Sequence, residues 1–186
     1  MATRTRATVD DILRLASAGQ RYELVNGELV EMAPTGFGHG DVEGHVAWLL
    51  RTHVLEHRLG KIVVGEVLFQ LDREGRLARA ADVAFVRQER LPPKDLEQRP
   101  FVGVPDLVVE IMSPNDTAED IEQKVSDWLD HGTLAVLIVY PNVRRVSIRR
   151  QSGGVYLQGD DEVDLDPALR GFRCKAGDFF PVEAGS

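Results

Sequence analysis

The sequence predicts a single α/β domain in which a mixed β-sheet is flanked by helices. The chain of 186 residues has the length of one domain, and its 43% hydrophobic and 28% charged residues are an ordinary globular balance. Apolar residues recur at helical spacing in some segments and form alternating or continuous runs in others, with turn-forming residues between them. We therefore expect one domain over residues 8–182, a disordered tail over 1–7 and a short tail over 183–186.

The first half of the chain predicts helices that alternate with paired strands. Asn26-Gly27 suits a type I′ turn, so the apolar stretches on either side of it predict an N-terminal hairpin. Val42, Val46 and Leu50 recur one helical turn apart and predict a long helix. The expected elements are a helix between Thr8 and Gly19, strands at 22–25 and 28–31, a loop at 34–38, a helix at 41–58, and strands at 61–71 and 78–86 around a turn.

The second half predicts buried strands around a third helix. Leu107, Val108 and Val109 form a continuous apolar run, which suits a strand buried on both faces. Gly132 ends a helix that follows the turn at 113–116. The expected elements are a surface loop at 87–104, a strand at 106–111, a helix at 117–131, strands at 133–140 and 143–149, a short strand near Tyr156, and a closing segment that packs Phe172, Phe179 and Phe180.

Composition narrows the class of function. The net charge of −8 and the pI of about 5.1 count against broad nucleic-acid binding, which usually leaves a basic footprint. They do not exclude nucleic-acid binding, because a metal site made of carboxylates is itself acidic and arginines cluster at 144–150. We find no run long enough to span a bilayer and no apolar secretory segment. The single cysteine, Cys174, rules out an intramolecular disulfide and a cysteine-based zinc site, so we expect a cytoplasmic protein.

Two acidic residues lie on strands of the predicted core. Asp82 lies within the apolar stretch 80–86, and Glu110 lies within the stretch 105–111. A carboxylate beside a buried strand is unfavourable unless something pairs it, and a hard cation such as Mg²⁺ prefers carboxylate oxygens. Lys124, in the helix that follows, could orient or deprotonate the attacking water or stabilise charge on a phosphoryl oxygen. These three are the candidate catalytic residues, and Asp82 and Glu110 are the candidate metal ligands.

Less specific interpretations of these and nearby residues stay open. Acids near strand ends are often solvated, or paired with an arginine such as Arg79. Glu66 could face the same cleft as Asp82 or simply face water. His39, at the start of a helix, could cap it or lie near the site.

A His-x-x-Glu-His pattern at residues 53–57 matches that of inverted zinc proteases. No motif supplies the third ligand, and His53 and His57 lie near the apolar stripe of their own helix. Packed or interface histidines are therefore the simpler interpretation. The sequence has neither a glycine-rich phosphate loop nor a Gly-x-Ser-x-Gly elbow, so ATPases and serine hydrolases have no support.

Several motifs, spread over nearly the whole chain, recur together in one known family. They are Tyr22–Pro34 with His39, Ala81–Val86, Pro105–Pro114, Lys124 with Trp128 and Gly132, Ile138–Pro141, and Leu169–Phe172. With these motifs the chain resembles the Uma-type restriction endonucleases of the PD-(D/E)XK nuclease superfamily, from about Thr8 to Pro181. The Glu-x-x-Ser-Pro block with its downstream lysine is the most specific part.

The resemblance implies a PD-(D/E)XK restriction-endonuclease-like fold and an endonuclease that uses Mg²⁺ or Mn²⁺ on nucleic acid, with DNA as the expected substrate. It makes Asp82 the first acid of the superfamily motif and Glu110 the second. Met112 occupies the usual lysine position, so the resemblance points to Lys124 instead. The supporting positions that it matches are Glu23 and His39.

Two positions depart from the family pattern, and one alternative to an active endonuclease stays open. Ala81 stands where a proline usually precedes the aspartate, and residues 134–137 replace a stretch that is usually aromatic, but neither change removes a proposed ligand. The alternative is a catalytically inactive nuclease-fold module for binding or assembly. The acidic composition and the missing strand lysine favour it, whereas the three retained site residues oppose it. We also expect a homodimer, with the helix that carries His53 and His57 as its contact.

Overall fold

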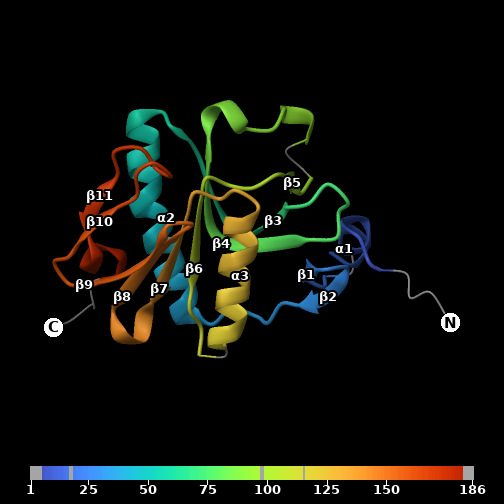
Figure 1. Ribbon diagram of the computed structural model, residues 1–186, viewed down its shortest axis with the longest axis horizontal. Helices are drawn as coiled ribbons and strands as arrows, with labels where there is room; N and C mark the ends of the chain where they lie inside the picture. Colours follow the sequence, from blue (N-terminus) through green and yellow to red (C-terminus); the bar gives the residue numbers. More distant parts are fainter. Residues whose placement is uncertain (1–5, 17–18, 97–98, 115, 182–186) are drawn as a thin grey trace.

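The computed structural model describes residues 6–16, 19–96, 99–114 and 116–181 (Figure 1). Most of the two expected tails lies outside these ranges, although the Ala7 N–H donates to the Gly27 carbonyl at 2.9 Å. The helices are α1 (Val9–Ala16), α2 (Phe37–His57) and α3 (Ala118–Asp130). The strands are β1 (Tyr22–Val25), β2 (Glu28–Glu31), β3 (Gly60–Gln70), β4 (Ala78–Arg87), β5 (Phe101–Val102), β6 (Leu107–Ile111), β7 (Ala135–Tyr140), β8 (Arg145–Arg150), β9 (Gly153–Gln158), β10 (Glu162–Asp164) and β11 (Arg173–Lys175).

The large sheet is mixed, and β4 lies near its centre. Its strand order is β2-β1-β4-β6-β7-β8-β9, and β3 pairs with both β4 and the short β5. β6 and β7 run parallel and are connected by α3, whereas β4 pairs antiparallel with β1, β3 and β6. The burial of β6 and β7 explains why both appear in the sequence as continuous apolar runs.

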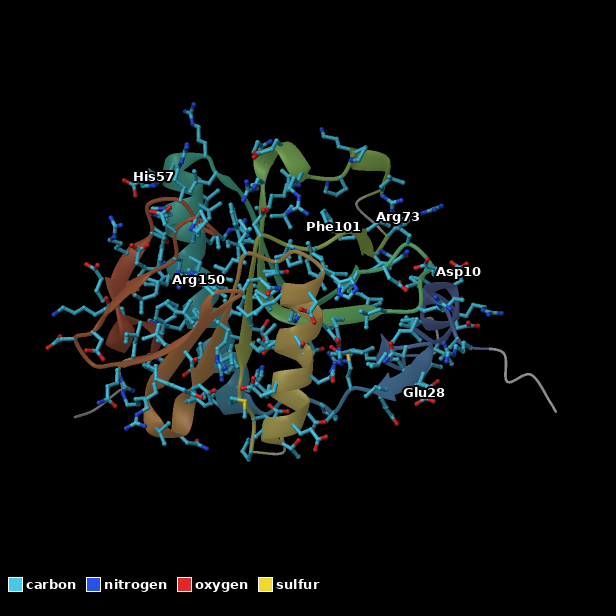
Figure 2. The ribbon with its side chains drawn as sticks, in the orientation of Figure 1. Asp10, Glu28, His57, Arg73, Phe101 and Arg150 are labelled. Atoms are coloured by element: carbon cyan, nitrogen blue, oxygen red, sulfur yellow. The ribbon has the colours of Figure 1, made fainter. Side chains whose placement is uncertain are left out.

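Helices cover both faces of this sheet, which confirms the predicted fold class. Figure 1 shows α3 in front of the sheet and α2 behind it. The apolar stripes that pack on the two faces are Val42, Val46, Leu50 and Val54 of α2, and Ile121, Val125 and Trp128 of α3. Asp10, Glu28 and Arg73 lie exposed on the right-hand side in Figure 2. None of the helices in the described ranges is long and apolar enough to cross a membrane.

Local signals in the sequence explain several boundaries. Asn26 and Gly27 have φ values of 52° and 81°, which confirms the type I′ turn between β1 and β2. The Thr117 hydroxyl caps α3 by accepting the Asp120 N–H at 3.1 Å. Arg58, in the left-handed region, ends α2.

The prediction was wrong at the start of α2 and missed the shortest strands. α2 begins at Phe37 instead of residue 41, so part of the expected loop at 34–38 is helical. Glycines at 36, 38 and 40 lower helix propensity, yet the Gly40 N–H still bonds to the Gly36 carbonyl at 3.1 Å. β5, β10 and β11 have two or three residues each, too few to show a hydrophobic period.

The closing segment packs as expected against the α2 side of the sheet. Leu169, Phe172, Phe179 and Phe180 are all buried, and they belong to the same cluster as the α2 stripe. The β10-β11 ribbon lies in this segment and forms a separate two-stranded sheet. The segment therefore completes the core behind β8 and β9.

Cys174 should react slowly with thiol reagents in the folded protein. Burial, together with the nearby Asp178 carboxylate, raises the pKa of its thiol to about 12. At pH 8 the thiolate is therefore scarce, and we expect labelling by an aromatic disulfide reagent to be about 10³-fold slower than for an unperturbed thiol. Guanidinium chloride should restore the ordinary rate, and the single cysteine makes the readout unambiguous. Rapid labelling of the folded protein would contradict this burial.

Candidate active site

The candidate site lies at a gap along one edge of β4. β3 pairs along the other edge, with a bulge opposite Asp82, so β1 and β6 share this one, with β1 paired at Ala78 and β6 from Val83 onward. Between them, the Ala80 N–H donates to Glu23 Oε1 at 3.0 Å, and Lys124 Nζ donates to the Ala80 carbonyl at 3.4 Å. Charged side chains thus replace a strand as partners of this backbone, which brings them into the protein interior.

Asp82 and Glu110 lie at this gap on adjacent strands. They stand opposite each other, one step beyond the last paired residues of β4 and β6, and are 9% and 2% exposed. Asp82 Oδ2 accepts the Ile111 N–H at 2.7 Å. Glu110 Oε1 accepts a hydrogen bond from Trp128 Nε1 at 2.9 Å, which fixes the carboxylate against α3.

Lys124 joins two of the carboxylates at the gap. Its Nζ lies 3.2 Å from Glu110 Oε2 and 3.3 Å from Glu23 Oε1. Burial by itself lowers the pKa of Lys124, but the charges of Glu110, Glu23 and Asp82 outweigh burial and raise this pKa above its ordinary value. Lys124 is therefore a fixed positive charge in the folded protein.

The cluster carries more negative than positive charge. Burial raises the pKa of Glu110 to about 7; Lys124 opposes this shift, and Asp82 and Glu23 add to it. Lys124 and Arg79 together therefore face four carboxylates, those of Asp82, Glu110, Glu23 and Asp127, in a poorly solvated place. An additional cation would relieve this imbalance.

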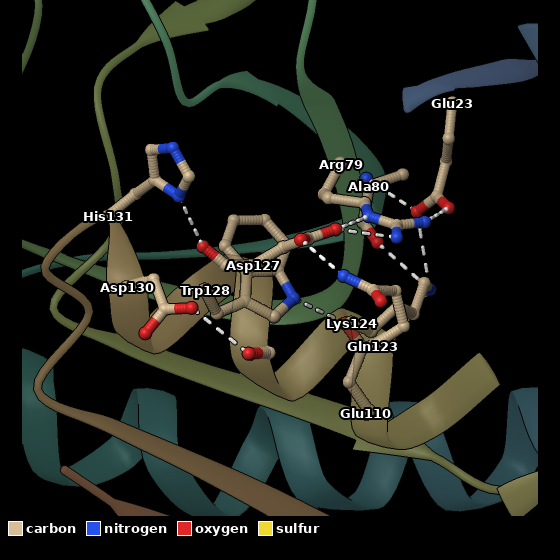
Figure 3. A network of polar contacts seen from close by, with 11 residues as sticks. Glu23, Arg79, Ala80, Glu110, Gln123, Lys124, Asp127, Trp128, Asp130 and His131 are labelled. Atoms are coloured by element: carbon tan, nitrogen blue, oxygen red, sulfur yellow. Dashed lines mark hydrogen bonds and ion pairs between the residues drawn. The ribbon is translucent and has the colours of Figure 1, made fainter. Parts of the chain in front are cut away.

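A second ion-pair network holds Glu23 in place (Figure 3). Arg79 Nη1 lies 2.7 Å from Glu23 Oε2, and Arg79 Nη2 lies 2.6 Å from Asp127 Oδ2. Gln123 Nε2 donates to the other Asp127 oxygen at 2.9 Å. Arg79 thus pairs with acids other than Asp82 and Glu110, and it positions the carboxylate that contacts Lys124.

His39 approaches the cluster from the first turn of α2. Its Nε2 lies 3.5 Å from Asp82 Oδ1, and this contact with the Asp82 carboxylate raises the pKa of His39, although burial opposes the shift. The buried Nδ1 has no hydrogen-bond partner among the described residues. A buried ring nitrogen without a partner, on an imidazole that touches a carboxylate, indicates a place where a ligand or water binds.

Glu66 lies close in the strand register but contacts another residue. Gly65 and Glu66 form a bulge of β3 opposite Asp82, with φ values of 84° and 59°. The Glu66 carboxylate pairs with Arg21, and the Glu66 side chain is only 8% exposed. Glu66 is therefore shielded from water and paired with Arg21, and its supporting role stays a prediction.

The histidines of the zinc-protease pattern are engaged within the chain. His53 Nε2 lies 2.9 Å from the Arg170 carbonyl and its ring packs edge-on against Phe172, while His57 Nδ1 lies 3.0 Å from the His53 carbonyl. Across the described part of the chain, no three His, Cys, Asp or Glu side chains are grouped so as to hold a metal by themselves. The simpler interpretation of packed histidines fits these contacts.

Sequence reasoning missed Asp127 and assigned Trp128 no role in the site. The helical period of α3 held the signal, because Lys124, Asp127 and Trp128 are three and four residues apart and so share one face. A polar and an aromatic residue on the buried face of a helix indicate partners on the sheet.

Comparisons with known proteins identify the family. The family model "Uma2: Putative restriction endonuclease" matches residues 9–177. No curated protein is significantly similar to the chain in sequence. The crystal structure of "a putative nuclease belonging to DUF820" from Anabaena variabilis ATCC 29413 matches with a TM-score of 0.79 and 18% identity, over 92% of this chain and 96% of that one. The chain therefore belongs to the Uma2 family and has the restriction-endonuclease-like PD-(D/E)XK fold that its sequence predicts.

Proposed function

We propose that the protein is a metal-dependent endonuclease that hydrolyses phosphodiester bonds, with DNA as substrate. The observation that carries the proposal is the meeting of Asp82, Glu110 and Lys124 at the gap in β4, on two strands and one helix. Paired carboxylates with a nearby cation suit metal-assisted hydrolysis of phosphodiester bonds. Family membership supports the reaction class, and the resemblance in sequence favours DNA.

The donor set fits a divalent cation such as Mg²⁺ or Mn²⁺. Asp82 and Glu110 offer oxygen ligands from adjacent strands, and the excess negative charge favours a cation. His39 Nδ1 is buried beside them and has no hydrogen-bond partner among the described residues. Two carboxylates do not complete a coordination shell, so the Ile111 carbonyl and water would supply the remaining oxygens. When bound, the cation would stabilise negative charge on the phosphoryl group.

Lys124 would contribute a positive charge beside the bound cation. The charges of Glu110, Glu23 and Asp82 raise its pKa in the protein without a cation. Its ammonium would orient the attacking water and stabilise charge on a phosphoryl oxygen. Glu23, held by Arg79, fixes the position of that ammonium.

Nicking of supercoiled plasmid tests the proposal. Wild-type protein with Mg²⁺ or Mn²⁺ should convert supercoiled to open-circular DNA, and EDTA should stop the reaction. Asp82→Ala should lose the activity, because the variant lacks a proposed ligand. Asp130→Ala is the matched control, since this carboxylate lies exposed on α3 and should be dispensable.

Two other outcomes of the nicking assay would argue against the proposal. Equal cleavage by wild type and Asp82→Ala would mean a contaminant or a different site. The absence of cleavage on plasmids of varied sequence with either metal would favour the inactive binding or assembly module. The sequence favours that alternative on two counts, its acidic composition and the methionine at 112.

A further inference from the structure

The outward side of α2 carries large apolar side chains that nothing in the described structure covers. Phe37, Trp48 and Leu55 are 95%, 63% and 62% exposed. They lie eleven and seven residues apart, so they share one side of the helix, opposite the stripe that packs on the sheet. Aligned exposed apolar groups of this kind mark a surface for another molecule.

These residues belong to a regular seam. Six exposed residues of α2, three of them apolar, lie at alternating spacings of four and three residues, which is the spacing of contact positions in a coiled coil. We call this set the outer seam: Phe37, Asp41, Gly44, Trp48, Arg51 and Leu55, all of them exposed. The repeat predicts a partner that is itself a helix.

The outer seam is complementary to itself when two copies run antiparallel. Centred on residue 46, such a pair sets Phe37 against Leu55, Asp41 against Arg51, and Gly44 against Trp48. We propose that the outer seam binds the outer seam of a second copy of this chain and forms a two-fold symmetric homodimer. Two-fold symmetry requires that each contact be made in both directions, and all three pairs satisfy it.

The charges of Asp41 and Arg51 favour a second copy as the partner and an antiparallel direction for its helix. Across the described residues, no ion pair engages Asp41 or Arg51. The two lie ten residues apart on one helix, about 15 Å along its axis, so they cannot pair within a chain. A parallel arrangement in register would place Asp41 against Asp41 and Arg51 against Arg51, which is repulsive.

The shape of the helix surface at the middle of the outer seam also favours the antiparallel pairing. A Cβ added at Gly44 would meet no atom within 4 Å, so this position leaves room beside the helix. An indole from a facing helix fits such a place, and Trp48 is the large side chain that the antiparallel pairing brings there. The helix face with His53 that the sequence favoured as a contact is instead occupied by Arg170 and Phe172 of the same chain.

The dimer should be weak. Stable interfaces usually bury about 800 Å² per partner, and one helix about 31 Å long covers less than that. We expect a dissociation constant in the range of about 1–100 µM. Sedimentation of the full chain across this range should show conversion of monomer to dimer.

A charge exchange tests the proposed register. Asp41→Arg should be monomeric because the new arginine would face Arg51, and Arg51→Asp should be monomeric because the new aspartate would face Asp41. An equimolar mixture of the two variants should dimerise, since both contacts between positions 41 and 51 then join opposite charges. Glu56→Arg, which changes an exposed charge on α2 outside the outer seam, is the control and should dimerise like wild type.

Tryptophan fluorescence gives a second readout. Trp128 is fully buried already, so a concentration-dependent fall in acrylamide quenching would report on Trp48. The proposal is overturned if the wild type remains monomeric through about 300 µM, well above the expected dissociation constant. It is also overturned if Asp41→Arg still dimerises, or if the folded variants stay monomeric when mixed, with circular dichroism confirming their fold.

Discussion

Lys124→Met is expected to lower the free energy of unfolding by about 3–5 kcal/mol and to reduce metal-dependent cleavage by about 10³-fold. Methionine preserves an unbranched apolar side chain but removes the ammonium that lies 3.2 Å from Glu110 and 3.3 Å from Glu23. Glu110 and Asp82 would then stay buried without that ammonium, and Glu23 would keep only Arg79 as its cationic partner. Urea unfolding by circular dichroism measures the first effect, and plasmid nicking measures the second.

A second substitution separates stability from chemistry. Lys124→Met combined with Glu110→Gln should regain part of the lost stability, because one uncompensated carboxylate becomes a neutral amide, but it should regain no cleavage. Lys175→Met is the control, since this lysine is exposed and pairs with an exposed aspartate, and both measurements should stay close to wild type. If Lys124→Met unfolds like wild type, the ammonium is solvated and the buried cluster is wrong. If the variant cleaves like wild type, Lys124 has no part in the reaction.

The sequence predicted the parts of the site that follow from a single element. Asp82 and Glu110 stood out because each is a charge within an apolar strand, and Lys124 because it lies in the next helix and the family resemblance points to it. The order of strands and helices was predictable because hydrophobic periods and turn residues agree along the chain. The structure brings the three residues to one place.

The rest of the site depends on which strands pair with β4. The hydrophobic periodicity of a single element does not predict which strands pair with each other. The gap at Ala80 arises because β1 and β6 end at different points along the same edge. Glu23 and Lys124 meet there only because of that gap. The bulge at Glu66 likewise changes the direction of a side chain. It turns the Glu66 carboxylate toward Arg21, whereas a regular strand would have placed that carboxylate differently.

Arg79→Met should destabilise the protein by a similar amount, about 3–5 kcal/mol. Arg79 is 5% exposed, and its guanidinium lies 2.7 Å from Glu23 and 2.6 Å from Asp127, so its removal leaves two buried carboxylates. Arg79→Lys should recover only part of this loss, because a single ammonium cannot reproduce the fork that bonds both acids. Arg87→Met, on the same strand, is the matched control: its partner Asp106 keeps Arg90, so the effect should be much smaller.

The same substitution tests whether the network positions the site. Cleavage by Arg79→Met should fall although Arg79 contacts neither proposed ligand, because Glu23 loses the partner that holds it against Lys124. Combining Arg79→Met with Lys124→Met should cost less than the sum of the two single changes, in both stability and activity, since both act on the Glu23 carboxylate. Strict additivity would mean that the two ion-pair networks are independent, and that Glu23 does not connect them.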